Sequence, residues 1–326
     1  MLTPRALIAC RDRQSAPARR AQPILLGDGI TAQRATRRKH QIDQRSERFA
    51  QEGSGRHCPK LDRLPASGKT GTATHMEQPA VPRIFSHARR RMRWNRAAAR
   101  QAVQRSPAEF LFETFAEEIG DRLGFIRHEA TTGLLIGDPT GHTARVLAPH
   151  IHHLTRAGPS EIDADAMLPR HFDLIASLGL LDTVNDVPGA LLHIRHALTR
   201  EGLAIIGLTG AGSLPALREA MLAAEPDRTA ARIHPMIDIQ AAAALMQRAG
   251  FSRQVADHFP LKVRYGSFDR LIADLRDQGL TGVLTNSPPP LGKAALARAR
   301  AAFMARADAD GKVTETFELI ILTGWG

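Results

Sequence analysis

Short apolar runs alternate with helical patterns after residue 106, and this alternation constrains the fold more than any other feature of the chain. The apolar runs cover 131–136, 151–155, 172–177, 203–208 and 317–322. Apolar residues recur at helical spacing in 142–147, 187–198, 214–224, 237–249 and 268–277. Strands that alternate with helices predict βαβ units. We therefore expect an α/β fold in which helices cover both faces of a mostly parallel sheet.

The segment Ser106-Pro-Ala-Glu109 has three features of a helix start. Ser106 can cap a helix, Pro107 suits the first helical position, and Glu109 stands three residues after the cap. A stripe of apolar residues follows at helical spacing, at Phe112, Phe115, Ile119 and Leu123. We expect a helix that begins at Ser106 and turns this stripe toward the core.

The charge of the chain is unevenly distributed. The formal net charge is +11, with 44 Lys+Arg and 33 Asp+Glu. Residues 1–75 carry +9, residues 76–105 carry +7, and residues 106–326 carry −5. Clustered cations can neutralise phosphates, but the region with the fold pattern is mildly acidic. The charge therefore gives no reason to expect nucleic acid as a partner of the folded domain.

Residues 1–75 show little sustained apolar periodicity and are rich in Arg. Such a segment cannot bury enough apolar surface to offset its ordering entropy, so we expect a disordered extension. An organelle-targeting segment and a nucleic-acid-binding tail are the alternatives. A translation start at Met76 would remove the extension altogether. We expect three parts: the extension 1–75, a basic helix within 76–105, and a folded domain over 106–326.

Several other classes of site are disfavoured. The two cysteines, Cys10 and Cys58, cannot build a disulfide scaffold. No apolar run is long enough to span a membrane as a helix. His150, His152 and His153 resemble a metal site in density, but they lack a nearby acid or cysteine and alternate in facing on a strand. We therefore expect no metal site, no membrane span and a cytoplasmic protein.

Three segments carry a resemblance to a known family: Phe172-Asp-Leu-Ile175, Val184-Asn-Asp-Val-Pro188 and Leu198-Thr-Arg-Glu-Gly202. Together they resemble class I S-adenosylmethionine-dependent methyltransferases. Further segments narrow the resemblance: Ile233-His-Pro-Met236, Arg248-Ala-Gly-Phe251 and Thr323-Gly-Trp325. These are similar to the subfamily of the mitochondrial complex I assembly factor 5 type, which neighbours the malonyl-carrier-protein methyltransferase of biotin synthesis. The resemblance covers residues 84–326.

The resemblance implies a Rossmann-like fold with a seven-stranded sheet and S-adenosylmethionine as the cofactor. It places the following residues at the cofactor: Gly137, Asp138, Thr140 and Gly141 at the methionine end, Asp165 at the adenine, and Ser177 and Leu178 on the floor of the site. It also places His234 and Tyr265 beside the substrate. Methyl transfer depends mainly on alignment of an already activated sulfonium, so the motif identifies no catalytic base.

Three positions depart from the family pattern. Leu135 stands where the first strand of the family carries an acid, and Pro139 replaces the middle glycine of the loop. Pro139 removes a backbone N–H and fixes φ near about −65°. Arg156 stands near the place of the acid that holds the ribose hydroxyls, and a guanidinium has no acceptor for those protons.

Two classes of function follow from these observations. The first is methyl transfer from S-adenosylmethionine to a small acid, a carrier-bound acyl group or a protein side chain. The second is a non-methylating assembly or chaperone-like factor that keeps the fold, with a subunit of respiratory complex I as its partner. The assembly-factor subfamily is also associated with hydroxylation of a protein arginine, which would be a third chemistry. The retained glycines favour the first class, and Leu135, Pro139 and Arg156 favour the second.

Overall fold

The computed structural model describes residues 83–326, apart from 164–167, 170 and 229. The predictions for residues 1–75, for a start at Met76 and for Asp165 lie outside the described residues.

One sheet organises the described part of the chain. Its strands are β1 (Ala130–Gly137), β2 (Ile151–Ala157), β3 (Phe172–Leu178), β4 (Leu198–Thr209), β5 (Ser252–Tyr265) and β6 (Val313–Trp325). They lie in the order β2-β1-β3-β4-β6-β5. Strands β2, β1, β3 and β4 pair in parallel, and β6 is antiparallel to both β4 and β5. The expected mostly parallel α/β sheet is confirmed. The described residues form six strands rather than the seven that the resemblance implied.

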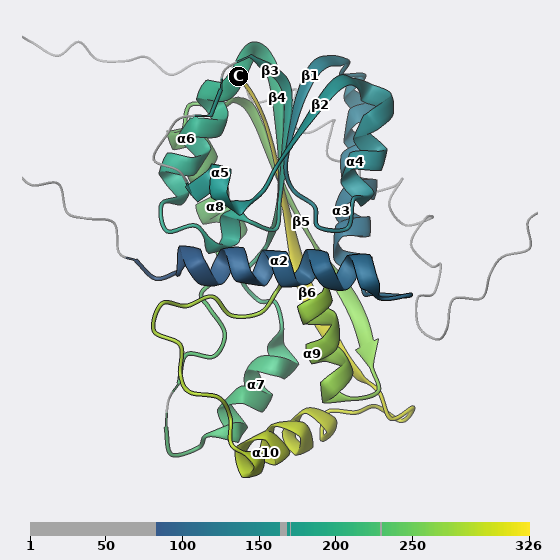
Figure 1. The fold of residues 1–326 in the computed structure, drawn as a ribbon, viewed down its shortest axis with the longest axis vertical. Helices are drawn as coiled ribbons and strands as arrows, with labels where there is room; N and C mark the ends of the chain where they lie inside the picture. The colour runs from purple at the N-terminus through teal and green to yellow at the C-terminus, as the bar shows by residue number, and fades with distance from the viewer. Residues whose placement is uncertain (1–82, 164–167, 170, 229) are drawn as a thin grey trace, which may run out of the picture. The chain divides into compact units, whose positions relative to one another are not determined.

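Helices cover both faces of this sheet (Figure 1). On one side lie α3 (Phe110–Ile126) and α4 (His142–Leu147), and on the other lie α5 (Pro159–Asp163), α6 (Val187–Ala197) and α8 (Ile239–Arg248). Short 3-10 turns stand at Ala148–His150 (η1) and Leu181–Thr183 (η2). The helices expected over 142–147, 187–198 and 237–249 are therefore present.

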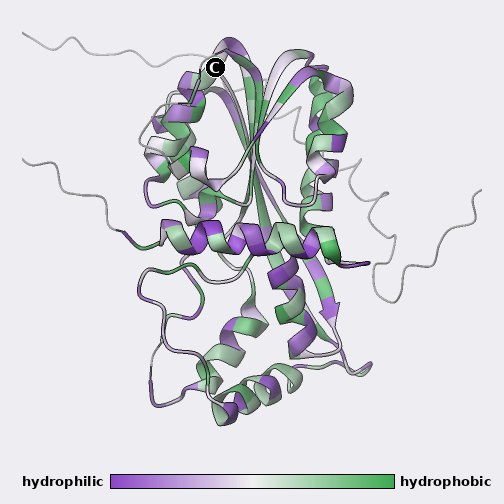
Figure 2. Cartoon of the chain, viewed as in Figure 1, coloured by the Kyte–Doolittle hydropathy of each residue, from purple (hydrophilic) through white to green (hydrophobic). Residues whose placement is uncertain are grey.

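The core lies on the two faces of the central strands. Successive strand residues point to opposite faces, so Leu135, Leu203 and Ile205 belong to one buried cluster and Ile136 and Ile206 to the other. Figure 2 shows the hydrophobic residues gathered along these strands and hydrophilic residues concentrated on the helix that crosses in front of them. Near-continuous apolar runs are thus explained by burial on both faces.

The helix predicted to begin at Ser106 begins at Phe110, three residues after the expected first helical position, Pro107. Its N-cap, Glu109, makes no side-chain capping bond. One of the free backbone donors is instead satisfied by a residue far along the chain, because Gln278 Oε1 accepts from Leu111 N at 2.8 Å. The prediction of Ser106 as the cap is therefore wrong, since a tertiary contact replaces the local one.

A second group of helices surrounds the extended ends of β5 and β6. This group consists of α7 (Pro215–Ala224), α9 (Phe268–Asp277) and α10 (Lys293–Met304), which the lower half of Figure 1 shows. The helices at 214–224 and 268–277 were expected from the sequence. The sequence pattern did not predict β5 and α10.

The basic helix expected within residues 76–105 is α2 (His87–Val103), which runs across the strand ends in Figure 1. Phe85 forms an isolated antiparallel bridge with Leu284 just before the helix. Near its other end, Arg100 Nε lies 2.5 Å from Asp277 Oδ1 of α9. Contacts at both ends therefore hold α2 in place. Within the described ranges, no helix has both the length and the apolar character needed to cross a membrane.

Candidate functional site

The strand order places a candidate site at the carboxyl ends of β1 and β3. The chain leaves β1 for β2 on one side, and then returns to β3 on the other side of β1. Such a reversal opens a crevice between the loops that leave the two strands, and open α/β sheets bind ligands there. Gly137, the last residue of β1, pairs with Leu178, the last residue of β3. The predicted residues Gly137, Ser177 and Leu178 are therefore brought together.

Gly137 is required by the backbone at this point. Its φ is 104°, and a Cβ placed on it would lie 2.3 Å from the carbonyl oxygen of Leu178. Any side chain would push apart the ends of the two strands. Gly141 also has a positive φ, 76°, and forms the N-cap of α4 without comparable crowding. These two glycines shape a tight loop after β1.

Asp138 organises that loop with its own side chain. Its carboxylate Oδ1 accepts from Thr140 Oγ1 at 2.9 Å and from Gly141 N at 2.8 Å. Its Oδ2 accepts from Ala144 N, in the first turn of α4, at 3.1 Å. Asp138 is fully buried. The side chain therefore caps α4 and takes up donors that a bound anionic group would otherwise use.

The floor of the crevice is formed by the end of β3. Leu178 is fully buried in the core. Ser177 is also buried, and its hydroxyl has no hydrogen-bond partner. An unpaired buried hydroxyl is costly, and it is the one polar side-chain group among the predicted floor residues.

Arg90 of α2 spans the crevice. Its guanidinium donates from Nη1 to the Thr183 carbonyl at 2.9 Å and from Nη2 to the Pro159 carbonyl at 3.3 Å. Pro159 follows β2 and Thr183 follows β3, and β1 lies between these two strands. The guanidinium therefore lies across the carboxyl end of β1. Burial, and then the neighbouring Arg93, lowers the pKa of Arg90 to about 10, so the group is charged at neutral pH.

Arg156, near the end of β2, contacts the loop after β1. It pairs in register with Leu135, the residue that replaces the expected acid of β1. Its Nη2 donates to the Asp138 carbonyl at 3.3 Å. The Arg156 guanidinium thus lies beside the loop after β1, at the position where the resemblance implies an acid for the ribose hydroxyls. A guanidinium cannot accept a hydrogen bond from those hydroxyls.

The fit of S-adenosylmethionine to these residues is poor in the arrangement that the structure shows. Asp138 and Thr140 occupy the donors of the glycine loop, at Gly141 N, Ala144 N and His142 N. Arg90 occupies the space above β1. Of the predicted cofactor residues that the structure describes, Ser177 has a buried side-chain hydroxyl without a partner.

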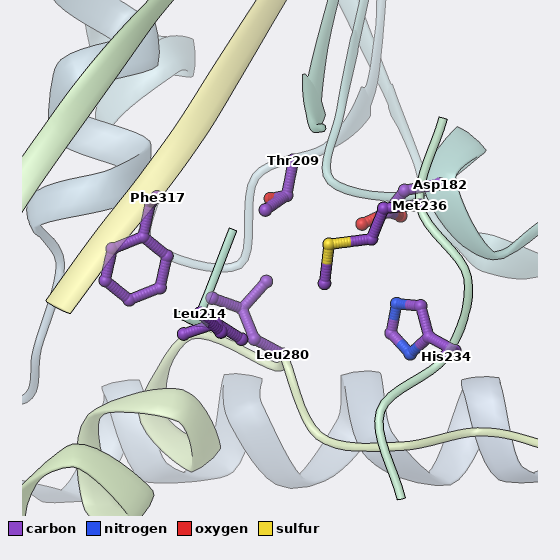
Figure 3. Close-up of a pocket in the computed structure, with 7 residues that line it drawn as sticks. All are labelled: Asp182, Thr209, Leu214, His234, Met236, Leu280 and Phe317. Atoms are coloured by element: carbon purple, nitrogen blue, oxygen red, sulfur yellow. The ribbon is translucent and has the colours of Figure 1, made fainter. Parts of the chain in front are cut away.

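A small cavity lies beside this crevice, beyond the carboxyl end of β4. Its volume is about 10 Å³, enough for one water-sized group. Figure 3 shows the seven side chains that surround it: Asp182, Thr209, Leu214, His234, Met236, Leu280 and Phe317. They come from η2, β4, β6 and the loops around α7, α8 and α9. The predicted substrate-lining residue His234 is among them.

The electrostatics of the cavity depend on His234 and Asp182. Burial lowers the pKa of the His234 imidazole; Asp182 opposes this effect, while Arg93 and Arg218 reinforce it. The imidazole is therefore neutral at neutral pH, with one donor and one acceptor. It also contacts the Phe85 ring edge-on, with 5.6 Å between centroids.

Comparison with known proteins agrees with the family expected from the sequence. No family model matches the chain. The mouse protein named arginine-hydroxylase NDUFAF5, mitochondrial, is 26% identical over 308 residues, which span 83% of this chain and 88% of that protein. The human protein of the same name is 26% identical over 276 residues, or 76% and 78% of the two chains. The resemblance to the NDUFAF5 type is confirmed.

A second group of relatives matches a smaller part of the chain. The malonyl-[acyl-carrier protein] O-methyltransferase of Gallionella capsiferriformans is 25% identical over 167 residues, 51% of this chain and 56% of that enzyme. Among solved structures, the YcgJ protein of Bacillus subtilis has a TM-score of 0.43 and 12% identity, covering 64% of this chain and 97% of that one. The NDUFAF5 proteins therefore match more of this chain than the enzyme does.

The second residue predicted to line a substrate site, Tyr265, lies elsewhere. It ends β5, is almost fully buried, and packs in the cluster that includes Phe268 and Leu271 of α9. Burial and the nearby carboxylates of Asp274 and Glu315 raise its pKa. Tyr265 thus does not belong to the set of residues that lines the cavity with His234.

Sequence reasoning missed four residues of this region: Arg90, Arg93, Asp182 and Thr209. The two arginines had a detectable signal, because Arg90, Arg93 and Ala97 recur on one face of the helix and all three are buried. No local sequence pattern indicated that Asp182 or Thr209 faces a cavity. Among the described residues, no group of three or more His, Cys, Asp or Glu side chains is arranged to hold a metal.

Proposed function

We propose that this chain is a methyltransferase-fold factor of the NDUFAF5 type that acts on a protein of respiratory complex I, and does not transfer methyl groups from S-adenosylmethionine. The observation that carries the proposal is the position of Arg90, which bonds to the loops after β2 and β3 and so crosses the end of β1. The extent of the match to the NDUFAF5 proteins, 83% of this chain for the mouse relative, supports the same conclusion.

The second candidate is methyl transfer, and a specific observation favours it. The loop after β1 keeps Gly137 and Gly141 in positive-φ conformations, at the switch point where a cofactor of this fold would bind. The relatives with methyltransferase names support S-adenosylmethionine as the cofactor of the fold. Substrates of this candidate are a small acid, a carrier-bound acyl group or a protein side chain.

Calorimetric titration of the full chain with S-adenosylmethionine separates the two candidates. We expect no saturable heat and no thermal shift for the wild type, because Asp138 occupies the donors of the glycine loop and Arg156 stands in place of the ribose-binding acid. The variants Arg156→Asp and Pro139→Gly restore the residue types of the family pattern. They test whether the departures at these two positions prevent cofactor binding. If the wild type binds the cofactor in the micromolar range, the methyltransferase candidate replaces our proposal.

The role in assembly is tested in the source organism. Deletion of the gene is expected to lower the amount of assembled complex I, measured by in-gel NADH dehydrogenase activity, and the wild-type chain is expected to restore it. Normal complex I in the deletion strain would contradict the proposed role. The NDUFAF5 relatives are mitochondrial by name. The cytoplasmic location expected from the sequence stays a prediction that cell fractionation tests.

A further inference from the structure

Helix α2 carries a largely apolar row on the face that points away from the sheet. Its inward side chains include Arg90 and Arg93, which are both buried. Met92 on the outer face is 54% exposed, and Val103 beside it along the helix is 84% exposed. A surface helix ordinarily directs its apolar stripe toward the core, so the outward row of α2 has the character of a contact surface. The row consists of five exposed residues: Ala88, Met92, Asn95, Ala99 and Ala102.

The row has the repeat of a seam between two helices. Its members are separated by four, three, four and three residues. This alternation keeps side chains on one line along a helix, where they interlock with the same line on a second helix. The positions that flank such a seam face the charged residues of the partner helix. On α2 these flanking positions hold Arg89 and Arg96 on one side and Arg91 on the other, and all three are exposed. We define the outer face of α2 as the row together with these three arginines.

The arginines of the outer face have no carboxylate partner within the described part of the chain. The segment 83–105 contains no Asp or Glu. Arg96 Nε instead donates to the Met92 carbonyl of its own helix at 3.2 Å. On α10, by contrast, the exposed Arg300 pairs with Asp269 of α9. A helix that packs on this face therefore gains most if its own flanking positions carry carboxylates.

The composition of the outer face decides between the possible occupants. A second copy of α2 would bring like charges against these arginines. Helices that lie on membranes carry Trp, Phe or Leu on the apolar face, and single-stranded nucleic acid stacks on aromatic side chains. The row on α2 is mainly alanine and has no aromatic residue. We propose that the outer face of α2 docks an acidic amphipathic helix of a partner protein. The inference goes beyond the proposed function, because it concerns a surface outside the crevice and holds for either candidate reaction.

A pair of synthetic helical peptides tests the proposal. Both carry Leu at the seam positions; the first carries Glu at every flanking position, and the second carries Lys there. The full chain is titrated into each fluorescein-labelled peptide, and fluorescence anisotropy measures binding at low and at high salt. We expect saturable binding of the Glu peptide that weakens as salt screens the charges, and no saturable binding of the Lys peptide. Absence of binding of the Glu peptide to the wild type would refute the docking surface.

Substitutions on the outer face distinguish its seam from its charge. Arg89→Glu combined with Arg96→Glu should weaken binding of the Glu peptide about tenfold and create binding of the Lys peptide, which also reports that the variant is folded. Met92→Asn removes an apolar contact without adding charge and should weaken binding of the Glu peptide about fivefold. The matched control is Arg200→Glu combined with Arg248→Glu. It makes the same change in net charge at exposed arginines of β4 and α8 and should leave binding unchanged.

Three further results would overturn the proposal. Equal losses in the two double variants would mean that net charge alone, and not the outer face, attracts the Glu peptide. Tighter binding of phosphatidylglycerol vesicles than of the Glu peptide would assign the face to a membrane surface. A wild-type dimer in analytical ultracentrifugation that Arg89→Glu with Arg96→Glu dissociates would assign the face to a second copy of this chain.

Discussion

Several single residues in this chain have structural roles that the local sequence does not predict. Asp138 and Gly137 were expected to hold a cofactor, and the structure gives both a local task in shaping the loop after β1. His234 lines the small cavity beyond β4, while Tyr265 lies in the core around α9. Its neighbour there, Asp274, is a nearly buried carboxyl whose pKa is raised to about 6, chiefly by burial and against the opposing effect of Arg270.

Asp274 provides a prediction for the dependence of stability on pH. Its folded pKa lies above the unfolded value of 3.8, so the folded state binds more protons between the two values. The carboxyl therefore favours folding in acid, and this contribution is lost as the pH rises through about 6. Asp274→Asn should be more stable than the wild type at pH 7.5 by about 1–2 kcal/mol, after allowance for the lost partner of the exposed Arg270.

Urea unfolding of both proteins across pH 4–8 measures this difference. The gap between variant and wild type should shrink toward pH 4, where the wild-type carboxyl is protonated in the folded state. The exposed Asp269 of the same helix pairs with Arg300 and provides the control Asp269→Asn. A difference that grows toward acid would contradict the assigned direction of the Asp274 pKa.

At the scale of elements, the helix α2 was predicted from the sequence, but its packing against the loops at the strand ends was not. Its basic character is evident from the sequence, and arginine side chains are mostly exposed in folded proteins. Arg90 and Arg93 are nevertheless buried, and their hydrogen bonds tie α2 to the loops after β2, β3 and α9. Arg93 donates to the Thr281 carbonyl at 3.1 Å and to Thr183 Oγ1 at 3.2 Å. The helix is therefore part of the folded domain.

Two substitutions on α2 test this role. Arg93→Ala should lower the free energy of unfolding by about 2–4 kcal/mol, because it removes two buried hydrogen bonds and the charge that balances Asp182. Arg91→Ala lies on the exposed side of the same helix and should change stability by less than about 0.5 kcal/mol. Chemical denaturation of both variants measures the contrast. Equal losses would mean that α2 contributes through helix propensity alone.

At the scale of the whole molecule, the last strand lies inside the sheet. Strand β6 pairs with β4 on one side and β5 on the other, although β4 precedes it by more than a hundred residues in the chain. Such pairing requires a large loop closure before it contributes favourable contacts. The sheet therefore cannot be completed until the C-terminal residues are in place.

Deletion of residues 313–326 should abolish cooperative unfolding, because it exposes one edge each of β4 and β5 and removes Phe317, Leu319 and Ile321 from the core. Removal of Gly326 alone breaks one backbone hydrogen bond, to the Gly202 carbonyl, and should leave a single transition. Differential scanning calorimetry of the two truncated chains provides the comparison. A cooperative transition in the longer deletion would show that β6 is dispensable.

The sequence by itself determined the α/β class, most helices and strands, and the resemblance to the NDUFAF5 type, because apolar periodicity reports which faces are buried and short motifs carry the resemblance. Only the tertiary structure decided which polar residues meet. The cap of α3 comes from Gln278, the crevice is crossed by Arg90, and the cavity joins Asp182 to Thr209. The residues in each of these contacts are far apart in the chain, so no local sequence pattern predicts that they meet. They come together only when the sheet and α2 are assembled.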